Sequence, residues 1–297
     1  MKPKILATGL TGMVGSRIEE LLSGHFEFIP LKLPEFDLLK VESLEKAFRR
    51  SPQAQTVLHL AAFTDVAAAW QERGDKQGRC YQTNVIGTGN LANLCAKYRK
   101  YLIYISTDYV FNGRKKTAYT EADQPGPIEW YGQTKFWAEE AVKKNLTDFS
   151  IVRIAFPFRA DFEPKLDIIR KIIKGLKEGN LPPMFTDQQT NPTFIDDIAW
   201  GLAKFFDRQP RGIFHLVASS FQSPYEMAMQ IAGIFGYDCD LVKKGSLVEF
   251  EKKLSPQDRP WHKNLGLSNE KVTSELGIKM KTLGEGLKEM EKQLGKN

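Results

Sequence analysis

The stretch Ile5-Leu6-Ala7-Thr8-Gly9-Leu10-Thr11-Gly12-Met13-Val14-Gly15 decides the fold. Its first three residues form a short apolar run that predicts a buried strand, and the residues that follow, through Leu22, predict a helix. The glycines between the two elements permit a tight turn and a close approach of the backbone. Their spacing is one residue longer at the first gap than the Gly-x-Gly-x-x-Gly fingerprint. Because a helix N-terminus attracts anions, we expect this turn to bind the pyrophosphate of a dinucleotide.

Strands and helices alternate through the first half of the chain. Further strands are predicted at residues 26–33, 56–60, 101–105, 150–154 and 213–217, and helices at residues 43–50 and 84–97 and from residue 131 onward. This alternation predicts an α/β fold with a doubly wound parallel sheet, the Rossmann fold, and right-handed crossovers.

The alternation loosens after residue 156. Helices are predicted at residues 166–176, 196–206 and 224–235, with a turn at residues 190–193. We therefore expect residues 1–155 to form an NAD(P)-binding Rossmann domain. Residues 156–297 should form mainly a smaller, mixed substrate-binding lobe, with about residues 190–217 returning to the Rossmann domain.

Composition narrows the class of protein. The chain has 297 residues, of which 42% are hydrophobic and 26% charged, as in ordinary globular proteins. Because we find no apolar run of about 18–20 residues and no leader before the first strand, we expect a cytoplasmic protein with no membrane partner. The net charge of +6 is spread along the chain, which argues against a nucleic-acid partner and suits phosphorylated small molecules.

Neither a disulfide framework nor a metal site is predicted. Three cysteines, Cys80, Cys95 and Cys239, lack Cys-x-x-Cys spacing, and the four histidines are scattered without ligand spacing. One of them, His59, lies inside an apolar strand and is expected to be a core histidine. Asn84 is expected to be either a polar kink in its helix or a ligand for water and backbone near the site.

Tyr131 and Lys135 are the first candidates for catalysis. They stand four positions apart, so their side chains share one helix face with Ala138 and Val142, which should face the core. A cation beside a phenol favours the phenolate and would lower the pKa of Tyr131 from about 10. The alternative interpretation is an ordinary helix start with a solvated lysine.

Hydroxyl groups stand at the end of the preceding strand. Ser106 and Thr107, followed by Asp108, come directly after the apolar run of residues 101–105. In open parallel sheets ligands bind beyond the carboxyl ends of the strands. This position favours a functional role for the Tyr131–Lys135 pair.

The end of the second strand bears on cofactor choice. A basic residue there suits the 2′-phosphate of NADP, whereas an acidic one binds the ribose hydroxyls of NAD. Lys32 favours NADPH, and NADH remains an alternative because Asp37 follows nearby. Ala61 and Ala62, at the end of the third strand, are small enough to let a cofactor approach the backbone.

Five motifs in order resemble the extended short-chain dehydrogenase/reductase family, and within it the sugar-nucleotide-binding relatives of dTDP-4-dehydrorhamnose reductase. The resemblance covers nearly the whole chain. The motifs are Thr8-Gly9-Leu10-Thr11-Gly12-Met13-Val14-Gly15, His59-Leu60-Ala61-Ala62, Asn84-Val85-Ile86-Gly87-Thr88, Ser106-Thr107-Asp108-Tyr109-Val110-Phe111 and Tyr131-Gly132-Gln133-Thr134-Lys135.

The resemblance, together with the positions described above, implies the site residues. The cofactor-binding set is Gly9, Thr11, Gly12, Met13, Val14, Gly15, Lys32, Asp37, Leu38, Leu60, Ala61, Ala62, Ser106, Tyr131 and Lys135. The catalytic set is Thr107, Tyr131 and Lys135, and the substrate-binding set is Thr107, Asp108, Tyr109, Phe156 and Arg259. Arg259 is expected to bind a diphosphate, with a surface ion pair as the alternative.

The resemblance implies an enzyme, an NAD(P)H-dependent reductase of the C4 keto group of a nucleotide-linked 6-deoxy-4-keto sugar. It implies that Tyr131 supplies the proton, that Lys135 holds the nicotinamide ribose, and that Thr107 hydrogen-bonds the reacting oxygen. Similar dehydratases have a glutamate where this chain has Tyr109, so dehydration is disfavoured.

Two departures from the family concern the sugar pocket. Residues 154–158 lack the tryptophan that similar reductases carry near the sugar, and the run Ala67-Ala68-Ala69-Trp70 replaces acidic positions.

An alternative of another class is the regulatory β subunit of methionine adenosyltransferase, which resembles these reductases and binds NADP as a partner of another enzyme. Self-association as a homodimer is also compatible with the resemblance.

Overall fold

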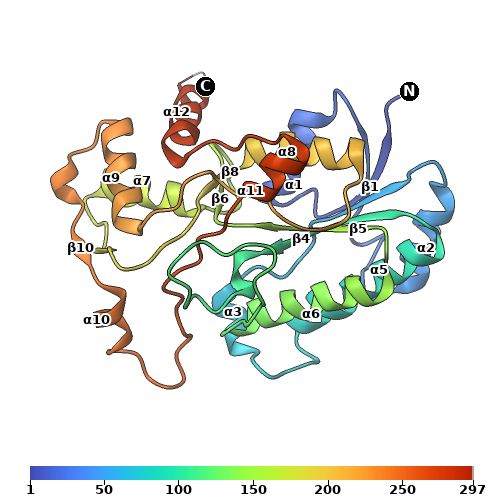
Figure 1. Ribbon diagram of the computed structural model, residues 1–297, viewed down its shortest axis with the longest axis horizontal. Helices are drawn as coiled ribbons and strands as arrows, with labels where there is room; N and C mark the ends of the chain where they lie inside the picture. The colour runs from blue at the N-terminus through green and yellow to red at the C-terminus, as the bar shows by residue number, and fades with distance from the viewer. Residues whose placement is uncertain (296–297) are drawn as a thin grey trace. The chain divides into compact units, whose positions relative to one another are not determined.

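A six-stranded sheet forms the centre of the first part of the chain, in a computed structural model that describes residues 1–295 (Figure 1). The strand order is β2-β1-β3-β4-β5-β9. The strands are β1 (Lys4–Thr8), β2 (Glu27–Leu31), β3 (Thr56–His59), β4 (Tyr101–Thr107), β5 (Phe149–Ile154) and β9 (Gly212–His215). The expected strand at 26–33 is thus shorter, and Ser106 and Thr107 lie inside β4 rather than after it.

The sheet reverses its order between β1 and β3. Strand β1 pairs in parallel with both β2 and β3, and β3 pairs in parallel with β4. Thr8 lies opposite His59, so the carboxyl ends of β1 and β3 are level. Because the chain moves outward from β1 to β2 and then returns to the other side, ligands are expected at this switch point.

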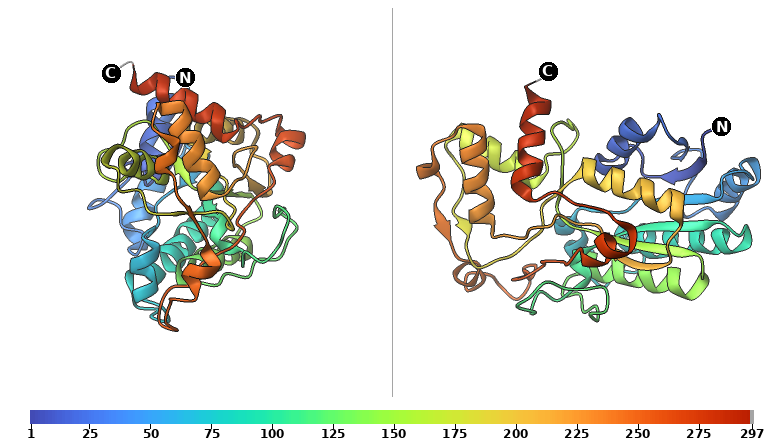
Figure 2. Two further views of the ribbon diagram at one scale, coloured as in Figure 1. Left: turned by 90° about the vertical axis from the view of Figure 1, so that its left-hand side faces the viewer. Right: turned by 45° about the horizontal axis from the view of Figure 1, so that its top comes forward.

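Helices cover both faces of the sheet. The segments that follow the strands are α1 (Met13–Leu22), α2 (Val41–Arg50), α3 (Val66–Gln71), α4 (Arg79–Tyr81), the π-helix η1 (Gln82–Gly87), α5 (Thr88–Lys97), the 3-10 helix η2 (Asp108–Val110), α6 (Trp130–Asn145) and α8 (Ile195–Arg208). Figure 1 shows α1 and α8 on one face, with α2, α5 and α6 on the other. Helices α5 and α6 lie side by side in both figures (Figure 2).

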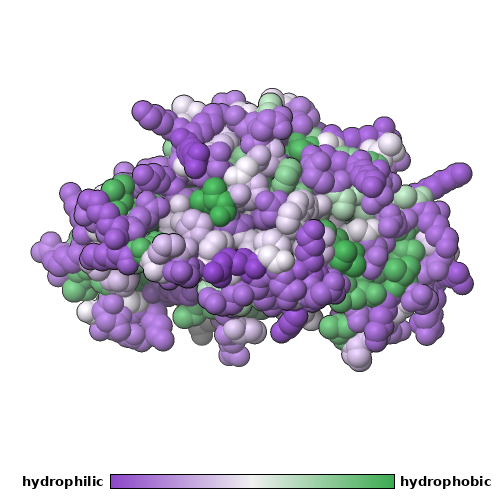
Figure 3. Space-filling model, turned by 90° about the horizontal axis from the view of Figure 1, so that it is seen from below, coloured by the Kyte–Doolittle hydropathy of each residue, from purple (hydrophilic) through white to green (hydrophobic). Residues whose placement is uncertain are grey.

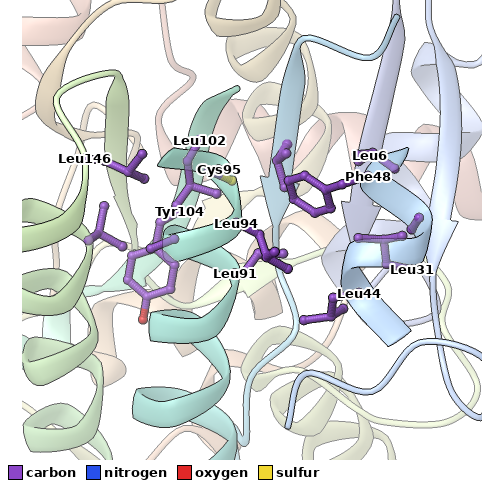
Figure 4. Packing of buried hydrophobic residues seen from close by; sticks show 14 of the residues in the cluster. Leu6, Leu31, Leu44, Phe48, Leu91, Leu94, Cys95, Leu102, Tyr104 and Leu146 are labelled. Carbon is purple, nitrogen blue, oxygen red and sulfur yellow. The ribbon is translucent and has the colours of Figure 1, made fainter. Parts of the chain in front are cut away.

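The core of this part lies between the sheet and helices α2, α5 and α6 (Figure 4). Apolar residues at helical spacing, such as Leu44 and Phe48 of α2, point at strand residues such as Leu6. Burying each such side chain contributes about 1.5–3 kcal/mol. This packing fixes the strands whose carboxyl ends carry the site.

Two compact units divide the chain. The first contains Met1–Phe111, Gln124–Arg153 and Ala199–Phe214, and the second contains Asn112–Asp123, Ile154–Ile198 and His215–Asn297. The segment that returns to the first unit is therefore shorter than the expected 190–217. The sequence pattern gave no indication that residues 112–123 belong to the second unit.

Helices and two small sheets form the second unit. Its elements are β6 (Pro157–Phe158), α7 (Ile168–Glu178), β7 (Met184–Phe185), β8 (Thr193–Phe194), α9 (Pro224–Phe235), the 3-10 helix η3 (Cys239–Leu241), β10 (Lys244–Gly245), α10 (Leu247–Glu251), α11 (Glu270–Leu276) and α12 (Leu283–Leu294). Strand β6 pairs with β8, and β7 with β10. Helices α7, α9 and α12 share one apolar cluster, to which Ile172, Ile231 and Leu287 belong.

The expected turn at residues 190–193 is wrong. The backbone of Thr190 pairs in both directions with the backbone of Gln222, at 3.0 and 3.1 Å, and β8 begins at Thr193. Thr190 and Thr193, at the two ends of this segment, therefore pair with backbone that is distant in sequence, which satisfies their hydrogen bonds without a local turn.

Hydrophilic residues cover most of the face drawn in Figure 3, and hydrophobic residues form separate patches on it. None of the helices within residues 1–295 is both long and apolar enough to span a membrane. Across the same residues, no group of three or more His, Cys, Asp or Glu side chains is arranged to hold a metal ion.

Candidate active site

The glycine turn lies at the switch point of the sheet. Gly9 has a φ of +73°, and a Cβ atom there would lie 2.6 Å from the backbone nitrogen of Ala61. A Cβ atom at Gly15 would overlap the carbonyl oxygen of Gly9. Helix α1 begins after Gly12, which provides no side-chain cap. This cradle of glycine backbone at a helix N-terminus fits a dinucleotide pyrophosphate.

Thr8 holds the ends of β1 and β3 together. Its hydroxyl contacts Nδ1 of His59 at 2.7 Å and accepts hydrogen bonds from the nitrogens of Leu60 and Ala61 at 3.2 and 3.1 Å. Nε2 of His59 lies 2.9 Å from the hydroxyl of Thr88. Burial lowers the pKa of His59 to about 3, so the ring is neutral. The prediction of a core histidine is confirmed, while Thr8, although part of the glycine motif, had been given no role.

Lys32 and Asp37 differ in their surroundings at the end of β2. Lys32 is exposed. Asp37 accepts a hydrogen bond from the nitrogen of Leu39 at 2.9 Å and so stabilises its own loop. Leu38 packs against Gly87, and its carbonyl accepts a hydrogen bond from Asn90 at 2.9 Å. The exposed cation at this strand end is compatible with the expected preference for a 2′-phosphate.

Thr107, Asp108 and Tyr131 lie together at the carboxyl end of β4. The hydroxyl of Thr107 donates to Oδ1 of Asp108 at 2.8 Å and accepts from the nitrogen of Tyr109 at 3.3 Å. It also hydrogen-bonds the side chain of Tyr131. The ring of Tyr109 meets that of Tyr131 edge-on, with centroids 5.7 Å apart. Residues that are 24 positions apart in sequence therefore form one hydrogen-bonded group.

Two residues that the sequence analysis did not assign position the start of α6. The carboxylate of Glu129 accepts hydrogen bonds from the nitrogens of Tyr131 and Gly132, the former at 2.9 Å, and caps the helix. A Cβ atom at Gly132 would overlap the carbonyl oxygen of Tyr109. Glycine here lets the helix approach η2 closely enough to bring Tyr131 to Thr107. A Glu before a helical pattern is the one feature that could have indicated the cap.

Lys135 points inward, as its helix face predicts. Its side chain is buried, Nζ donates to the carbonyl oxygen of Ile105 at 2.7 Å, and it lies 4.3 Å from the centroid of the Tyr104 ring. Burial lowers the pKa of Lys135 to about 7. The alternative of a solvated lysine is wrong.

The expected depression of the Tyr131 pKa is also wrong in this structure. Burial raises the pKa of Tyr131 well above its ordinary value, and the carboxyl groups of Asp108 and Glu129 raise it further. The ammonium of Lys135 is bonded to a backbone carbonyl rather than to the phenol. The phenol therefore keeps its proton at neutral pH.

A buried ion pair supports the end of β4. Arg153 donates to both carboxylate oxygens of Glu139, at 2.9 and 2.7 Å, and both side chains are fully buried. Ser106 donates its hydroxyl proton to the same carboxylate at 2.6 Å, so its side chain can meet the predicted cofactor as an acceptor and not as a donor. The guanidinium of Arg153 lies 4.9 Å from the centroid of the Phe111 ring. Sequence reasoning missed Glu139 because a helical glutamate is normally solvated.

Asn84 bonds the backbone, which decides between its two predicted roles. Its Oδ1 accepts from the nitrogen of Phe63 at 2.8 Å, and its Nδ2 donates to the carbonyl oxygen of Phe63 at 3.2 Å and to the hydroxyl of Thr134 at 3.0 Å. It lies in the π-helix η1 and is fully buried. Asn84 therefore connects the loop after β3 to helix α6.

The alanine run that departs from the family forms helix α3. Asp65 caps this helix by accepting from the nitrogen of Ala68 at 3.0 Å. Ala69 is fully buried in an apolar cluster with Trp130 and Tyr131. Small side chains here let α3 pack against the start of α6.

The two remaining substrate candidates belong to the second unit. Phe156 adopts a φ of +40°, which is a strained conformation for a residue with a side chain. The guanidinium of Arg259 lies 4.6 Å from the centroid of the Trp261 ring, and its Nη1 donates to the carbonyl oxygen of Pro260 at 3.4 Å. Their roles toward a substrate stay predictions.

A parallel sheet with a glycine turn at its switch point, and a Tyr-x-x-x-Lys pair beside the end of β4, define a Rossmann-fold protein of the extended short-chain dehydrogenase/reductase class. The family described as RmlD substrate binding domain matches residues 2–295. The chain belongs to this family.

Known relatives agree with this assignment. A probable low-salt glycan biosynthesis reductase of Haloferax volcanii is 31% identical over 299 residues, with 96% of each chain covered. The dTDP-4-dehydrorhamnose reductase of Mycolicibacterium smegmatis is 31% identical over 250 residues, covering 82% of this chain and 72% of that protein. A structure of dTDP-4-dehydrorhamnose reductase from Bacillus anthracis in complex with NADP superimposes with a TM-score of 0.88 at 24% identity, over 99% of this chain and 100% of that one. That structural likeness confirms the predicted fold.

Proposed function

We propose that the protein is an NADPH-dependent oxidoreductase that reduces the C4 keto group of a nucleotide-linked 6-deoxy-4-keto sugar. The observation that carries the proposal is the hydrogen-bonded group of Thr107 and Tyr131, at the same sheet edge as the glycine turn. The names of the relatives, reductases of a glycan pathway and of dTDP-4-dehydrorhamnose, support the substrate class. NADH remains the alternative cofactor.

The residues of the first unit fit such a cofactor along its length. Gly9 and Gly15 would hold the pyrophosphate against the N-terminus of α1, and Lys32 would meet the 2′-phosphate. Ala61 would line the middle of the cofactor, and Lys135 would contact the nicotinamide ribose. When bound, NADPH supplies the hydride.

The protein's part in the reaction is orientation and proton delivery. Burial keeps Tyr131 protonated at neutral pH, so its phenol is ready to donate to the keto oxygen when that oxygen gains negative charge. Thr107 would hydrogen-bond the same oxygen. Tyr109 stands where a similar dehydratase has a glutamate, and a phenol cannot take the role of that carboxylate. This favours reduction over elimination of water.

The second unit is proposed to bind the nucleotide sugar. Arg259, beside Trp261, offers a cation to the diphosphate, and strained Phe156 lies two residues beyond the end of β5. The departures at residues 67–70 and 154–158 leave the identity of the sugar to experiment. A cytoplasmic location and a homodimer are further parts of the proposal, and size-exclusion chromatography with light scattering tests the latter.

The test is NADPH oxidation, followed by absorbance, when the purified protein meets dTDP-4-keto-6-deoxy-L-lyxo-hexose. NADH is run in parallel. We expect substrate-dependent oxidation, and we expect Tyr131→Phe to lower kcat by about 10²–10⁴-fold while NADPH still binds. The matched control is Tyr98→Phe, because the Tyr98 hydroxyl bonds Glu45, between helices α5 and α2, and should not affect turnover.

Each outcome bears on one part of the proposal. Full activity in Tyr131→Phe would reject this residue as the proton donor. No oxidation despite NADPH binding would reject this sugar and direct the search to other keto sugars. Formation of a stable complex with a methionine adenosyltransferase, without oxidation, would support the regulatory alternative.

A further inference from the structure

The carboxyl group of Asp108 has no role in the reaction proposed above. Its side chain is 1% exposed. Oδ1 accepts the hydrogen bond from Thr107 at 2.8 Å, whereas Oδ2 is buried and has no hydrogen-bond partner within the protein. A buried carboxylate oxygen without a donor is costly, so these surroundings favour the protonated acid.

The protonation state of Asp108 decides to which group the hydroxyl of Thr107 can donate its proton. A hydroxyl has one proton and two lone pairs. When Asp108 is ionised, Thr107 gives it that proton and accepts from the nitrogen of Tyr109 and from the phenol of Tyr131. No proton of Thr107 then remains for the reacting oxygen or for a phenolate. When Asp108 carries a proton, it donates to Thr107, and the hydroxyl of Thr107 turns toward Tyr131.

We propose that Asp108 stores a proton and returns it to Tyr131 through the hydroxyl of Thr107 in each turnover. This inference rests on the proposed reductase function. Once Tyr131 has protonated the sugar oxygen, the phenolate takes the proton of Thr107 as Thr107 takes the proton of Asp108. Two O–H bonds break and two form, Asp108 ends as a carboxylate, and it regains a proton from water after product release.

The groups around Asp108 favour this role. Burial raises the pKa of Asp108 to about 7, against the lowering effect of hydrogen bonds from Thr107 and from the backbone of Asp108 and Tyr109. The carboxylate of Glu129, which caps α6, raises it further. The phenol of Tyr131 on α6 interacts with its charge, and the backbone of Tyr109 on η2 hydrogen-bonds its carboxyl group. Lys135, also on α6, bonds the carbonyl oxygen of Ile105 and offers Asp108 no ion pair in this geometry. Asp108 therefore exchanges its proton near neutral pH.

The test combines Asp108→Asn with two readouts. The first readout is the pH profile of kcat. In the wild type we expect kcat to fall as pH rises through about 7, because Asp108 is then ionised and has no proton to return to Tyr131. Asparagine keeps the shape but holds no exchangeable acid, so we expect a kcat about 10–100-fold lower and a smaller fall in that range. The part of the fall that remains is the one caused by Lys135, whose pKa burial also lowers to about 7. The second readout is infrared difference spectroscopy without substrate, in which the C=O band of a buried acid should titrate near the same pH and be absent from Asp108→Asn.

Two Thr107 variants keep the proposal testable if Asp108→Asn does not fold. Thr107→Ser keeps the hydroxyl and should retain the full fall of kcat with pH. Thr107→Val breaks the relay and should reduce the fall to the part that Lys135 causes, as in Asp108→Asn. An Asp108→Asn protein with the wild-type kcat and pH profile would overturn the relay, and so would a carboxyl band that is already ionised at pH 5. The infrared titration needs no turnover, so it separates failure of the relay from failure of the reductase assignment.

Discussion

Arg153→Met should destabilise the protein severely, because it leaves a buried carboxylate without its cation. In the structure Arg153 makes two hydrogen bonds to Glu139, at 2.9 and 2.7 Å, and the two side chains are 1% and 0% exposed. Removing one partner of a fully buried pair costs about 3–5 kcal/mol in the free energy of unfolding. Only the hydroxyl of Ser106 would remain on the carboxylate.

The size of the effect can be measured by urea unfolding and thermal melting at pH 7. A loss of this size would lower the melting temperature by roughly 6–20 °C, at about 2–4 °C per kcal/mol. Tryptophan fluorescence suits the measurement, since Trp70, Trp130, Trp137 and Trp200 belong to the unit that contains the ion pair. The activity should fall as well, because the pair holds the end of β4 through Ser106.

Two further variants separate the ion pair from other causes. Glu139→Leu combined with Arg153→Met removes both charges, and we expect it to recover most of the lost stability, since an apolar replacement of a buried pair is often neutral or better. Lys143→Met in the same helix breaks the exposed pair with Glu140 and should cost under about 1 kcal/mol. The reasoning fails if the single variant stays within about 1 kcal/mol of the wild type, or if the double variant is as unstable as Arg153→Met.

Three more predictions follow from single contacts. Gly132→Ala should lower kcat by about 10²-fold although alanine favours helices, because its Cβ atom would push the start of α6 away from Tyr109. Lys32→Ala should raise the Kd of NADPH about 10-fold and leave that of NADH unchanged if its charge meets the 2′-phosphate. The contribution of His59 to the free energy of unfolding should fall as pH drops from about 6.5 toward 3, because burial lowers the pKa of His59 to about 3 and the unfolded chain takes up the proton first. His59→Asn should remove this contribution, so we expect the difference in stability between the wild type and the variant to change over this pH range.

Matched controls accompany these variants. Gly89→Ala, in α5 with open space around the new Cβ atom, should stabilise by about 0.5–1 kcal/mol and keep activity. Lys144→Ala is the control for Lys32→Ala: it removes a positive charge at the far end of α6 and should change the Kd of neither cofactor. His25→Asn is the control for His59→Asn, because it replaces an exposed histidine. Gly132→Ala with wild-type kcat, equal effects of Lys32→Ala on both cofactors, or an unchanged pH dependence in His59→Asn would each contradict the corresponding argument.

The sequence by itself determined the fold class and most of the first unit. Hydrophobic runs of strand length and helical spacing are local properties, so they predicted the sheet and located the helix that carries Tyr131 and Lys135 on one inward face. The glycine turn was also readable, because a positive φ at Gly9 and a close approach at Gly15 exclude other residues. The order of these motifs along the chain was enough to indicate the family.

Only the tertiary structure decided the electrostatics of the site. The pKa of Tyr131 depends on how deeply the phenol is buried and on which charges lie around it, and those charges come from Asp108 and Glu129 rather than from Lys135. Packing also brings together the segments that form the ion pair of Glu139 and Arg153, and it buries Oδ2 of Asp108 without a hydrogen-bond donor. Local sequence patterns report which face of an element is apolar, but burial and charge contacts depend on partners that are distant in the chain.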